Sequence, residues 1–300
     1  MNLINETLFS DCLKKLTDNL VTLSDKPEDT HESTLRALWL AASGNYVASQ
    51  KVFDLELPDL SESQNISLND MINKRLNGIP LAHITGIQEF MGIDIHVNEH
   101  ALIPRKETEL LGYAALNKIN DIVNKNGTAF AFDICTGCGN LALAIASHQP
   151  NVSFYAMDLS NEAVSLAKDN KNFLGLDERV KFLVGDLLEP VKNMQMEEKV
   201  DVIICNPPYI TSGKLKDLPQ EIIKFEPEMA FNGGALGIKI INKLCQEAIE
   251  FLKPDGWLMF ELGLGQGEAI LERQKKKRLY KTFESIKDDN GYTRVIMLQK

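Results

Sequence analysis

The N-terminal part of the chain shows short apolar patterns with helical spacing and no clear strand-like alternation. Apolar residues recur at intervals of three and four within residues 8–75, most clearly over 34–42 (TLRALWLAA). Polar stretches at 25–32 and 60–70 interrupt this spacing. The pattern predicts a small all-helical domain over residues 1–80.

The next part of the chain breaks into short apolar pieces. Gly78, Pro80, Gly86 and Gly92 separate these pieces, and glycine and proline at such intervals are typical of turns between extended segments. We therefore expect a β-hairpin connector over residues 81–104.

From residue 105 onward, apolar runs that suit buried strands alternate with helical patterns. The expected strands cover 129–134, 152–158, 180–184, 200–205 and 257–261. The expected helices cover 141–147, 161–172 and 238–252. Two further strands, 282–287 and 294–298, flank a turn and suit an antiparallel hairpin. Repeated strand–helix units predict an α/β domain over 105–300, with helices on both faces of a mainly parallel sheet.

Composition and charge narrow the choice of partners. Hydrophobic residues make up 44% and charged residues 25% of the 300 residues, which is ordinary for a globular protein. The 32 basic and 42 acidic side chains leave a net charge of −10. A molecule of that charge repels polyanions and anionic membranes, so we expect neither direct nucleic-acid binding nor membrane contact.

Cysteine usage and the N-terminal segment indicate a compartment. Five cysteines are too few for disulfide bonds to stabilise a chain of this length, and such a low number is typical of proteins in a reducing environment. The first residues, MNLINETLFSDCLKK, lack a basic segment followed by an apolar run. We expect a cytoplasmic protein, and a monomer.

A glycine-containing turn follows the first expected strand of the α/β domain. Residues 133–140 read DICTGCGN, and glycines at a strand-to-helix junction let a ligand approach the backbone and the N–H groups of the helix. The spacing differs from the three-glycine dinucleotide motif. A tight connection without a ligand is the alternative. Cys135 and Cys138 have C-x-x-C spacing, but no second pair accompanies them, so we expect no metal or redox site.

Two aspartates end the next strands. Asp158 lies 19 residues after Gly139, where an acidic side chain can accept the hydroxyl groups of a ribose; the alternative is that it caps the helix that starts near Ser160. Asp186 follows Gly185 at the end of the third strand. It suits an exocyclic amine such as that of adenine, or a plain turn.

The most specific feature is the turn NPPY at 206–209, directly after a buried-type strand. Two prolines restrict the backbone, so the Asn206 side chain and the Pro207 carbonyl can be held in one orientation. These two oxygens suit the N–H groups of a planar amide or amine, and Tyr209 suits its flat face. The alternative is an ordinary Asn-Pro turn followed by a core tyrosine.

Further motifs occur in order along the chain: 75–80 (RLNGIP), 102–109 (LIPRKETE), 225–234 (FEPEMAFNGG), 261–266 (ELGLGQ) and 289–294 (DNGYTR). Together with the turns above, they resemble the HemK/PrmC family of class I S-adenosylmethionine-dependent methyltransferases. The resemblance implies a Rossmann-like seven-stranded methyltransferase domain behind a small helical domain that recognises the substrate. It also implies methylation of a glutamine side-chain nitrogen in a protein, most specifically in the GGQ loop of a peptide-chain release factor.

The resemblance assigns roles to individual residues. The S-adenosylmethionine site would comprise Asp133, Cys135, Thr136, Gly137, Cys138, Gly139, Asp158, Asp186, Leu187 and Asn206. The acceptor glutamine would be bound by Asn206, Pro207, Pro208 and Tyr209. Of these, Asn206, Pro207 and Tyr209 would be catalytic, by aligning and polarising the amide without a strong base.

Some positions depart from the family pattern. Lys106 stands where a proline is usual, Leu236 where an acidic residue is common, and Ile241-Asn242 where a Tyr-Arg pair is usual. These departures bear on the acceptor rather than on the cofactor.

Other functions therefore stay open. The chain could act on a glutamine of a ribosomal protein or on a small-molecule amide, or bind the cofactor without turnover. An adenine-N6 methyltransferase of DNA or RNA uses a similar turn on a flipped base, although the net charge of −10 argues against it.

Overall fold

The computed structural model of the protein describes residues 3–23, 25–176 and 178–300. These residues form two compact units, which we call the helical unit and the sheet unit. The helical unit comprises Met1–Glu99, Ile103–Lys106 and Pro219–Glu226, and the sheet unit comprises His100–Leu102, Glu107–Leu218 and Pro227–Lys300.

The helical unit is built from short helices and one hairpin. Its helices are α1 (Leu3–Asn19), α2 (His31–Ala42), η1 (Ser49–Asp54), α3 (Glu62–Leu76), α4 (Leu81–Thr85) and α8 (Gln220–Phe225). Trp39 of α2 is fully buried, and its indole Nε1 donates a 2.8 Å hydrogen bond to the Pro58 carbonyl. The predicted helical character of residues 1–80 is confirmed for the part of that range that the structure describes, and the hairpin follows it.

One expectation within this unit is wrong. The polar stretch 60–70 was expected to interrupt the helices, but it forms most of α3. Ser61 caps this helix, and the Gln64 side chain completes a capping box. Leu68 and Ile72 are the buried apolar residues of this helix, and most of its other positions are in contact with solvent. The sequence of the helix is therefore mostly polar, which hides its helical pattern.

The expected hairpin is present, over a shorter range. Strand β1 (Ile87–Phe90) pairs antiparallel with β2 (Ile93–His96), and Ile87 lies opposite His96. Helix α4 occupies the start of the segment 81–104. The division into 1–80, 81–104 and 105–300 stays a prediction. The compact units cut the chain elsewhere, since Pro219–Glu226 belongs with the N-terminal residues.

The sheet unit contains a seven-stranded mixed sheet. Its strands are β3 (Ala129–Ile134), β4 (Val152–Asp158), β5 (Val180–Val184), β6 (Val200–Cys205), β7 (Leu252–Glu261), β8 (Thr282–Lys287) and β9 (Thr293–Gln299). The order is β5-β4-β3-β6-β7-β9-β8, in which β9 runs antiparallel to both of its neighbours, β7 and β8. The predicted α/β architecture is confirmed, and β7 begins five residues earlier than expected.

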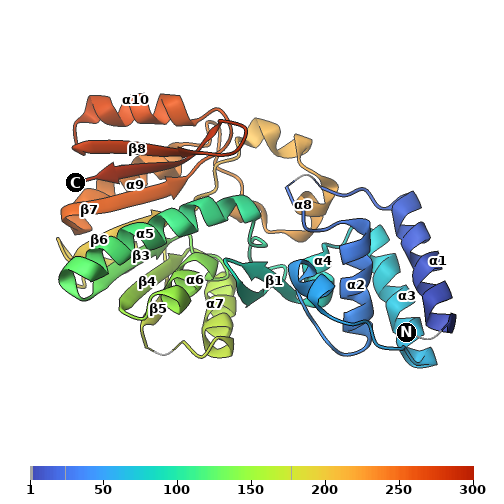
Figure 1. Ribbon diagram of the computed structural model, residues 1–300. Helices are drawn as coiled ribbons and strands as arrows, with labels where there is room; N and C mark the ends of the chain where they lie inside the picture. The colour runs from blue at the N-terminus through green and yellow to red at the C-terminus, as the bar shows by residue number, and fades with distance from the viewer. Residues whose placement is uncertain (1–2, 24, 177) are drawn as a thin grey trace. The chain divides into compact units, whose positions relative to one another are not determined.

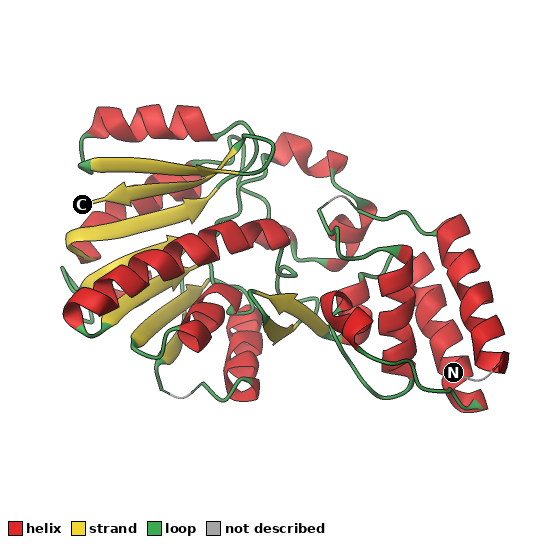
Figure 2. Ribbon diagram, in the orientation of Figure 1, coloured by secondary structure: helices red, strands yellow, loops and turns green. Residues whose placement is uncertain are grey.

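Helices cover both faces of this sheet (Figures 1 and 2). On one face lie α5 (Glu109–Asn126), α6 (Asn140–His148) and α7 (Asn161–Phe173), and on the other α9 (Lys239–Phe251) and α10 (Gly267–Lys277). The helical patterns expected at 141–147, 161–172 and 238–252 match α6, α7 and α9. Helices α5 and α10 were not expected. None of the helices in the described residues combines the length and apolarity needed to cross a membrane.

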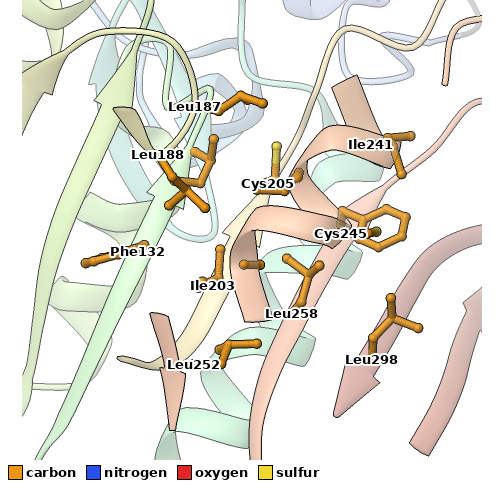
Figure 3. Close-up of a cluster of buried hydrophobic side chains, with 14 of the residues drawn as sticks. Phe132, Leu187, Leu188, Ile203, Cys205, Ile241, Cys245, Leu252, Leu258 and Leu298 are labelled. Atoms are coloured by element: carbon orange, nitrogen blue, oxygen red, sulfur yellow. The ribbon is translucent and has the colours of Figure 1, made fainter. Parts of the chain in front are cut away.

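A buried apolar cluster lies between the sheet and α9 (Figure 3). Phe132, Ile203 and Leu258 come from three adjacent strands, and Ile241 and Cys245 come from α9. Each fully buried side chain of the size of leucine or phenylalanine contributes about 1.5–3 kcal/mol. Strands β3, β4, β5 and β6 pair parallel to one another, so the turns that follow them all lie at one edge of the sheet.

Candidate active site

The turn after β3 carries the first group of predicted site residues. Cys135 has a positive φ of 59°, Gly137 of 56° and Gly139 of 85°. No atom lies within 4 Å of the position that a Cβ on Gly137 would take, so a ligand can approach the backbone there. Gly139 differs, because a Cβ there would lie 2.9 Å from the Leu143 side chain. Gly137 therefore faces open space, and Gly139 allows close packing of α6.

Asp133 lies beneath this turn. Its side chain is fully buried, and Oδ2 accepts hydrogen bonds from the Thr136 hydroxyl at 2.6 Å and from the Ala142 amide at 3.2 Å. Burial raises the pKa of this carboxyl to about 7. Asp133 thus connects Thr136 to the first turn of α6, and the cofactor contacts predicted for Asp133 and Thr136 stay a prediction.

The segment Cys135-Thr-Gly-Cys138 lies within this turn. Cys138 is buried, and burial raises the pKa of its thiol to about 12. The thiol is therefore protonated at neutral pH. Cys135 is partly exposed, and all five cysteines, each within the described residues, are free.

Asp158 ends β4 beside the same turn. Its Oδ2 accepts a 2.8 Å hydrogen bond from the Gly137 amide, and Oδ1 accepts one of 2.9 Å from the Ser160 amide. The cap of α7 is the Ser160 side chain, which accepts from the Ala163 amide. Asp158 therefore ties the glycine turn to the start of α7, and its half-buried carboxylate keeps lone pairs for a further donor.

Asp186 and Leu187 lie beyond β5 and differ in exposure. The Asp186 side chain is 55% exposed and pairs with Lys243 at 2.5 Å, whereas Leu187 is buried and joins the apolar cluster of Figure 3. Of the two, Asp186 is open to solvent, but its carboxylate already has a cationic partner.

The NPPY turn follows β6 at the same edge. Asn206 is half-buried and Pro207 is buried. The Asn206 side chain donates a 3.2 Å hydrogen bond from Nδ2 to the hydroxyl of Thr108. With Nδ2 engaged in this way, Oδ1 is the atom that can accept an N–H from another molecule.

Tyr209 is held at both ends. Its hydroxyl donates to Glu261 Oε1 at 3.0 Å, and its carbonyl oxygen accepts from Gln266 Nε2 at 3.0 Å. Glu261 ends β7, and Gln266 immediately precedes α10. Burial, followed by the charge of Glu261, raises the pKa of Tyr209 well above its ordinary value, so the phenol keeps its proton.

A second polar layer lies behind Tyr209. The Arg294 guanidinium on β9 donates to Glu107 Oε1 at 2.9 Å and lies 3.7 Å from Glu261 Oε1. Burial raises the pKa of Glu261 to about 7. The sequence assigned no role to Glu107, Thr108, Glu261, Gln266 or Arg294, although each lies in one of the motifs that carried the resemblance.

The glycine-rich segment 231–237 packs against the NPPY turn. The Ile210 amide donates to the Phe231 carbonyl at 2.9 Å, and the Gly233 amide donates to the Ile210 carbonyl at 2.8 Å. A Cβ added to Gly233 would lie 2.6 Å from the Pro208 carbonyl oxygen, and one added to Gly237 would overlap with the Tyr209 carbonyl oxygen. Glycine is therefore required for this close approach, which fixes the back of the turn.

The departures from the family pattern differ in their exposure. Lys106 is exposed and belongs to the helical unit, and Leu236 is 70% exposed. Ile241 is buried in the core, and Asn242 Oδ1 accepts a 3.4 Å hydrogen bond from Gln274.

The sequence is similar to that of known methyltransferases. The family model "Methyltransferase small domain" matches residues 118–253. The release factor glutamine methyltransferase of Rhodopirellula baltica is 34% identical over 80% of this chain and 80% of its own length. The proteins of the same name from Thermodesulfovibrio yellowstonii and Bacillus subtilis are also 34% identical, over 82% and 73% of this chain and 85% and 75% of their own lengths.

Solved structures share the fold at lower identity. The catalytic domain of hMettl16 in complex with the MAT2A 3'UTR hairpin 1 has a TM-score of 0.55 at 16% identity, over 76% of this chain and 80% of that chain. The human methyltransferase 10 domain containing protein has a TM-score of 0.51 at 17% identity, over 77% and 96%. These likenesses establish the fold of the sheet unit.

Proposed function

The chain belongs to the family of release factor glutamine methyltransferases, and on that basis we propose that it methylates the glutamine of the GGQ loop of a peptide-chain release factor. The methyl group would come from S-adenosylmethionine and pass to the side-chain amide nitrogen. The observation that carries this proposal is the Asn206 side chain, held by Thr108 with Oδ1 as its open acceptor.

The residues at the strand edge fit S-adenosylmethionine. The open space at Gly137 leaves room for a ligand against the backbone, and Asp158 lies beside it with a carboxylate that can accept ribose hydroxyls. Helix α6 begins at this turn, its N-cap residue Gly139 has no side chain, and in its first turn the Ala142 amide is bound by Asp133 from below. Cys135 to Gly139 and Asp158 would hold the cofactor, which when bound supplies a methyl group on a positively charged sulfur.

The acceptor residues would orient the glutamine amide and make its nitrogen more reactive. The nitrogen of an amide is a weak nucleophile, because its lone pair is shared with the carbonyl. Asn206 Oδ1 and the Pro207 carbonyl would each accept one N–H of the glutamine, which orients the nitrogen and increases its electron density. The ring of Tyr209 would pack against the flat amide. No strong base is needed, since the amide loses its proton after the nitrogen has become positively charged.

The roles of Asp133 and Asp186 are secondary in this proposal. Asp133 would support the cofactor turn from below through Thr136 and the Ala142 amide. Asp186 would accept an adenine amine with lone pairs that its surface ion pair with Lys243 leaves free.

We extend the proposal to partners and compartment. The net charge of −10 favours a protein acceptor over a nucleic acid, because it repels polyanions. Release factors act in translation, so we place the enzyme in the cytoplasm, and we propose that it acts as a monomer.

Incubation with labelled S-adenosylmethionine tests the proposal. A release factor, a ribosomal protein fraction, a small-molecule amide and nucleic acid would be offered in turn. We expect label in the release factor, and its loss when the GGQ glutamine is replaced. Label confined to nucleic acid or to ribosomal protein would contradict the proposal.

A further inference from the structure

Helix α7 carries a buried polar side chain that contacts the turn after β3. Asn170 is 0% exposed, although most asparagines in proteins are solvated. Its Nδ2 donates a 3.0 Å hydrogen bond to the carbonyl oxygen of Cys138, which lies 32 positions earlier in the chain. A carbonyl oxygen can only accept, so this partner fixes the orientation of the Asn170 amide group. The buried amide therefore acts on the backbone of the turn.

The peptide unit that Asn170 contacts is held from both sides. The Cys138 carbonyl and the Gly139 N–H belong to one planar unit and point in opposite directions. Asn170 binds the carbonyl, and the Gly139 amide donates to the Thr136 carbonyl at 2.9 Å. The unit cannot rotate without breaking both hydrogen bonds. Together these bonds set the shape of the turn.

Strand β4 and helix α7 contact the same turn at two more points. A Cβ on Gly139 would lie 3.2 Å from the Cβ of Ala167, which also belongs to α7. Asp158, at the end of β4, accepts the Gly137 amide at 2.8 Å. Three consecutive residues of the turn are thus each contacted from β4 or α7.

We propose that α7 positions the turn after β3, with Asn170 as its positioning residue for S-adenosylmethionine. Asn170 would act through the Cys138 carbonyl and would not touch the cofactor itself. Without its NH₂ group, the buried Cys138 carbonyl would lose this hydrogen bond, which is unfavourable for a buried polar group. The peptide unit would then be free to rotate, and the open side of Gly137 would change shape. This inference rests on the proposed function, in which residues 135–139 bind the cofactor.

Two variants of the full chain remove this hydrogen bond with little change in side-chain size. Asn170→Leu removes both polar groups, and Asn170→Asp places a carboxylate oxygen where the NH₂ group was. Tyr280→Phe is the matched control, because the buried Tyr280 hydroxyl also donates to a backbone carbonyl, that of Cys245 at 2.9 Å. Tyr280 directly precedes Lys281 and β8, and three strands separate β8 from β3.

Three measurements on each protein separate positioning from general stability. They are the Kd of S-adenosylhomocysteine by calorimetry, kcat for release factor methylation at saturating S-adenosylmethionine, and the free energy of unfolding in urea. Asn170→Leu and Asn170→Asp should each raise the Kd about tenfold or more, while kcat stays within about threefold of the wild type. Tyr280→Phe should keep the Kd within about twofold. A purely structural role of Asn170 would lower the stability of the fold and leave the Kd unchanged.

The contrary results are as specific. A folded Asn170→Leu variant with a Kd within about twofold of the wild type would overturn this inference alone. So would an equal rise of the Kd in Tyr280→Phe, because the effect would then be a general one. A wild type that binds no S-adenosylhomocysteine would contradict the proposed function, and this inference with it.

A third variant covers the case in which neither Asn170 variant folds. Ala167→Val adds two methyl groups beside Gly139, so it displaces the turn from the same helix without removing a hydrogen bond. We expect the Kd of S-adenosylhomocysteine to rise about tenfold here too. A Kd within about twofold of the wild type would show that α7 does not position the turn.

Discussion

The Gln266 side chain donates a 3.0 Å hydrogen bond to the carbonyl oxygen of Tyr209, and its own Oε1 accepts one of 3.0 Å from the Gly263 amide. The Gln266 side chain thus joins the segment after β7 to the NPPY turn after β6. It fixes the backbone of Tyr209, while Glu261 fixes the hydroxyl. The NPPY turn is therefore held by residues that follow a neighbouring strand, and not by its prolines alone.

The first prediction concerns Gln266→Glu. The variant replaces the N–H donor by a carboxylate oxygen that faces a carbonyl, so the Tyr209 backbone loses its partner. An unsatisfied buried group costs about 1–3 kcal/mol, and we expect kcat to fall about tenfold with little change in cofactor affinity. Gln149→Glu is the control, because Gln149 also donates through Nε2, to Asn120 at 2.7 Å. Equal losses in both variants, measured by methylation kinetics, would argue against the specific role of Gln266.

The second prediction concerns the close contact at Gly237. An added Cβ would overlap with the Tyr209 carbonyl oxygen, and the φ of 65° also disfavours a side chain. Gly234→Ala is the matched control, since its φ is 78° but no atom lies within 4 Å of the added Cβ. We expect Gly234→Ala to cost about 1–2 kcal/mol of unfolding free energy and Gly237→Ala about 1–3 kcal/mol more, with loss of turnover. Similar activity of the two variants would show that the contact does not position the turn.

The third prediction concerns a buried ion cluster within the helical unit. Glu221 accepts Lys26 at 2.7 Å and Arg75 at 2.6 Å, and all three side chains are less than a tenth exposed. Glu221→Gln leaves two cations with one neutral partner, so we expect the unfolding free energy to fall by about 3–5 kcal/mol. The exposed Glu56 is the control, and Glu56→Gln should change stability by about 0.5 kcal/mol or less. Chemical denaturation measures both.

The same cluster predicts a pH dependence. Burial alone would raise the pKa of Glu221, but Lys26 and Arg75 hold it below its ordinary value of 4.5. A carboxyl with a lowered pKa in the folded state stabilises the protein above its unfolded pKa and loses this effect as the pH falls. The stability difference between the wild type and Glu221→Gln should therefore shrink below about pH 4.5. A difference that stays constant down to acid pH would contradict the assigned ion pairs.

The fourth prediction concerns Glu261, whose pKa is raised, whereas the pKa of Glu221 is lowered. Burial raises its pKa from 4.5 to about 7, so the unfolded chain loses this proton first as the pH rises. The wild type should lose stability relative to Glu261→Gln between these two pH values, by up to about 3 kcal/mol, and the difference should then be constant. Urea unfolding of both proteins at several pH values measures it. Relative stabilisation of the wild type as the pH rises would contradict the raised pKa.

The fifth prediction concerns Asn206→Ala. If Asn206 serves the acceptor, the variant should bind S-adenosylhomocysteine within about tenfold of the wild type while it loses most of its turnover. Calorimetry and methylation kinetics on the same preparations provide the two values. A loss of binding as large as the loss of turnover would show that Asn206 serves the cofactor.

Much of the sheet unit could be predicted from the sequence, because its parallel strands are short, apolar and buried on both faces. The run 200–205 is buried at every position, and its bounds agree with the prediction. Helix α5 was not predicted, although its buried positions follow helical spacing. Strand β7 begins early because Leu252 pairs with Val200 before the irregularity in the ladder.

The supports of the active site could not be predicted in the same way. Thr108 lies 98 residues before Asn206, and Glu261 lies 52 residues after Tyr209. Nothing in the local sequence distinguishes a threonine at a helix start from a cap, or a glutamate at a strand end from a surface residue. The sequence also could not predict that Pro219–Glu226 belongs to the helical unit. The contact between Lys26 and Glu221 joins residues that are 195 positions apart.

The central claim is that Asn206 and its supports present a glutamine nitrogen for methylation. Mass spectrometry of a release factor incubated with S-adenosylmethionine and either the wild type or Asn206→Ala tests it most directly. The account predicts one added methyl group on the GGQ glutamine with the wild type and almost none with the variant. An unmodified glutamine with the wild type, or equal methylation by both proteins, would contradict it.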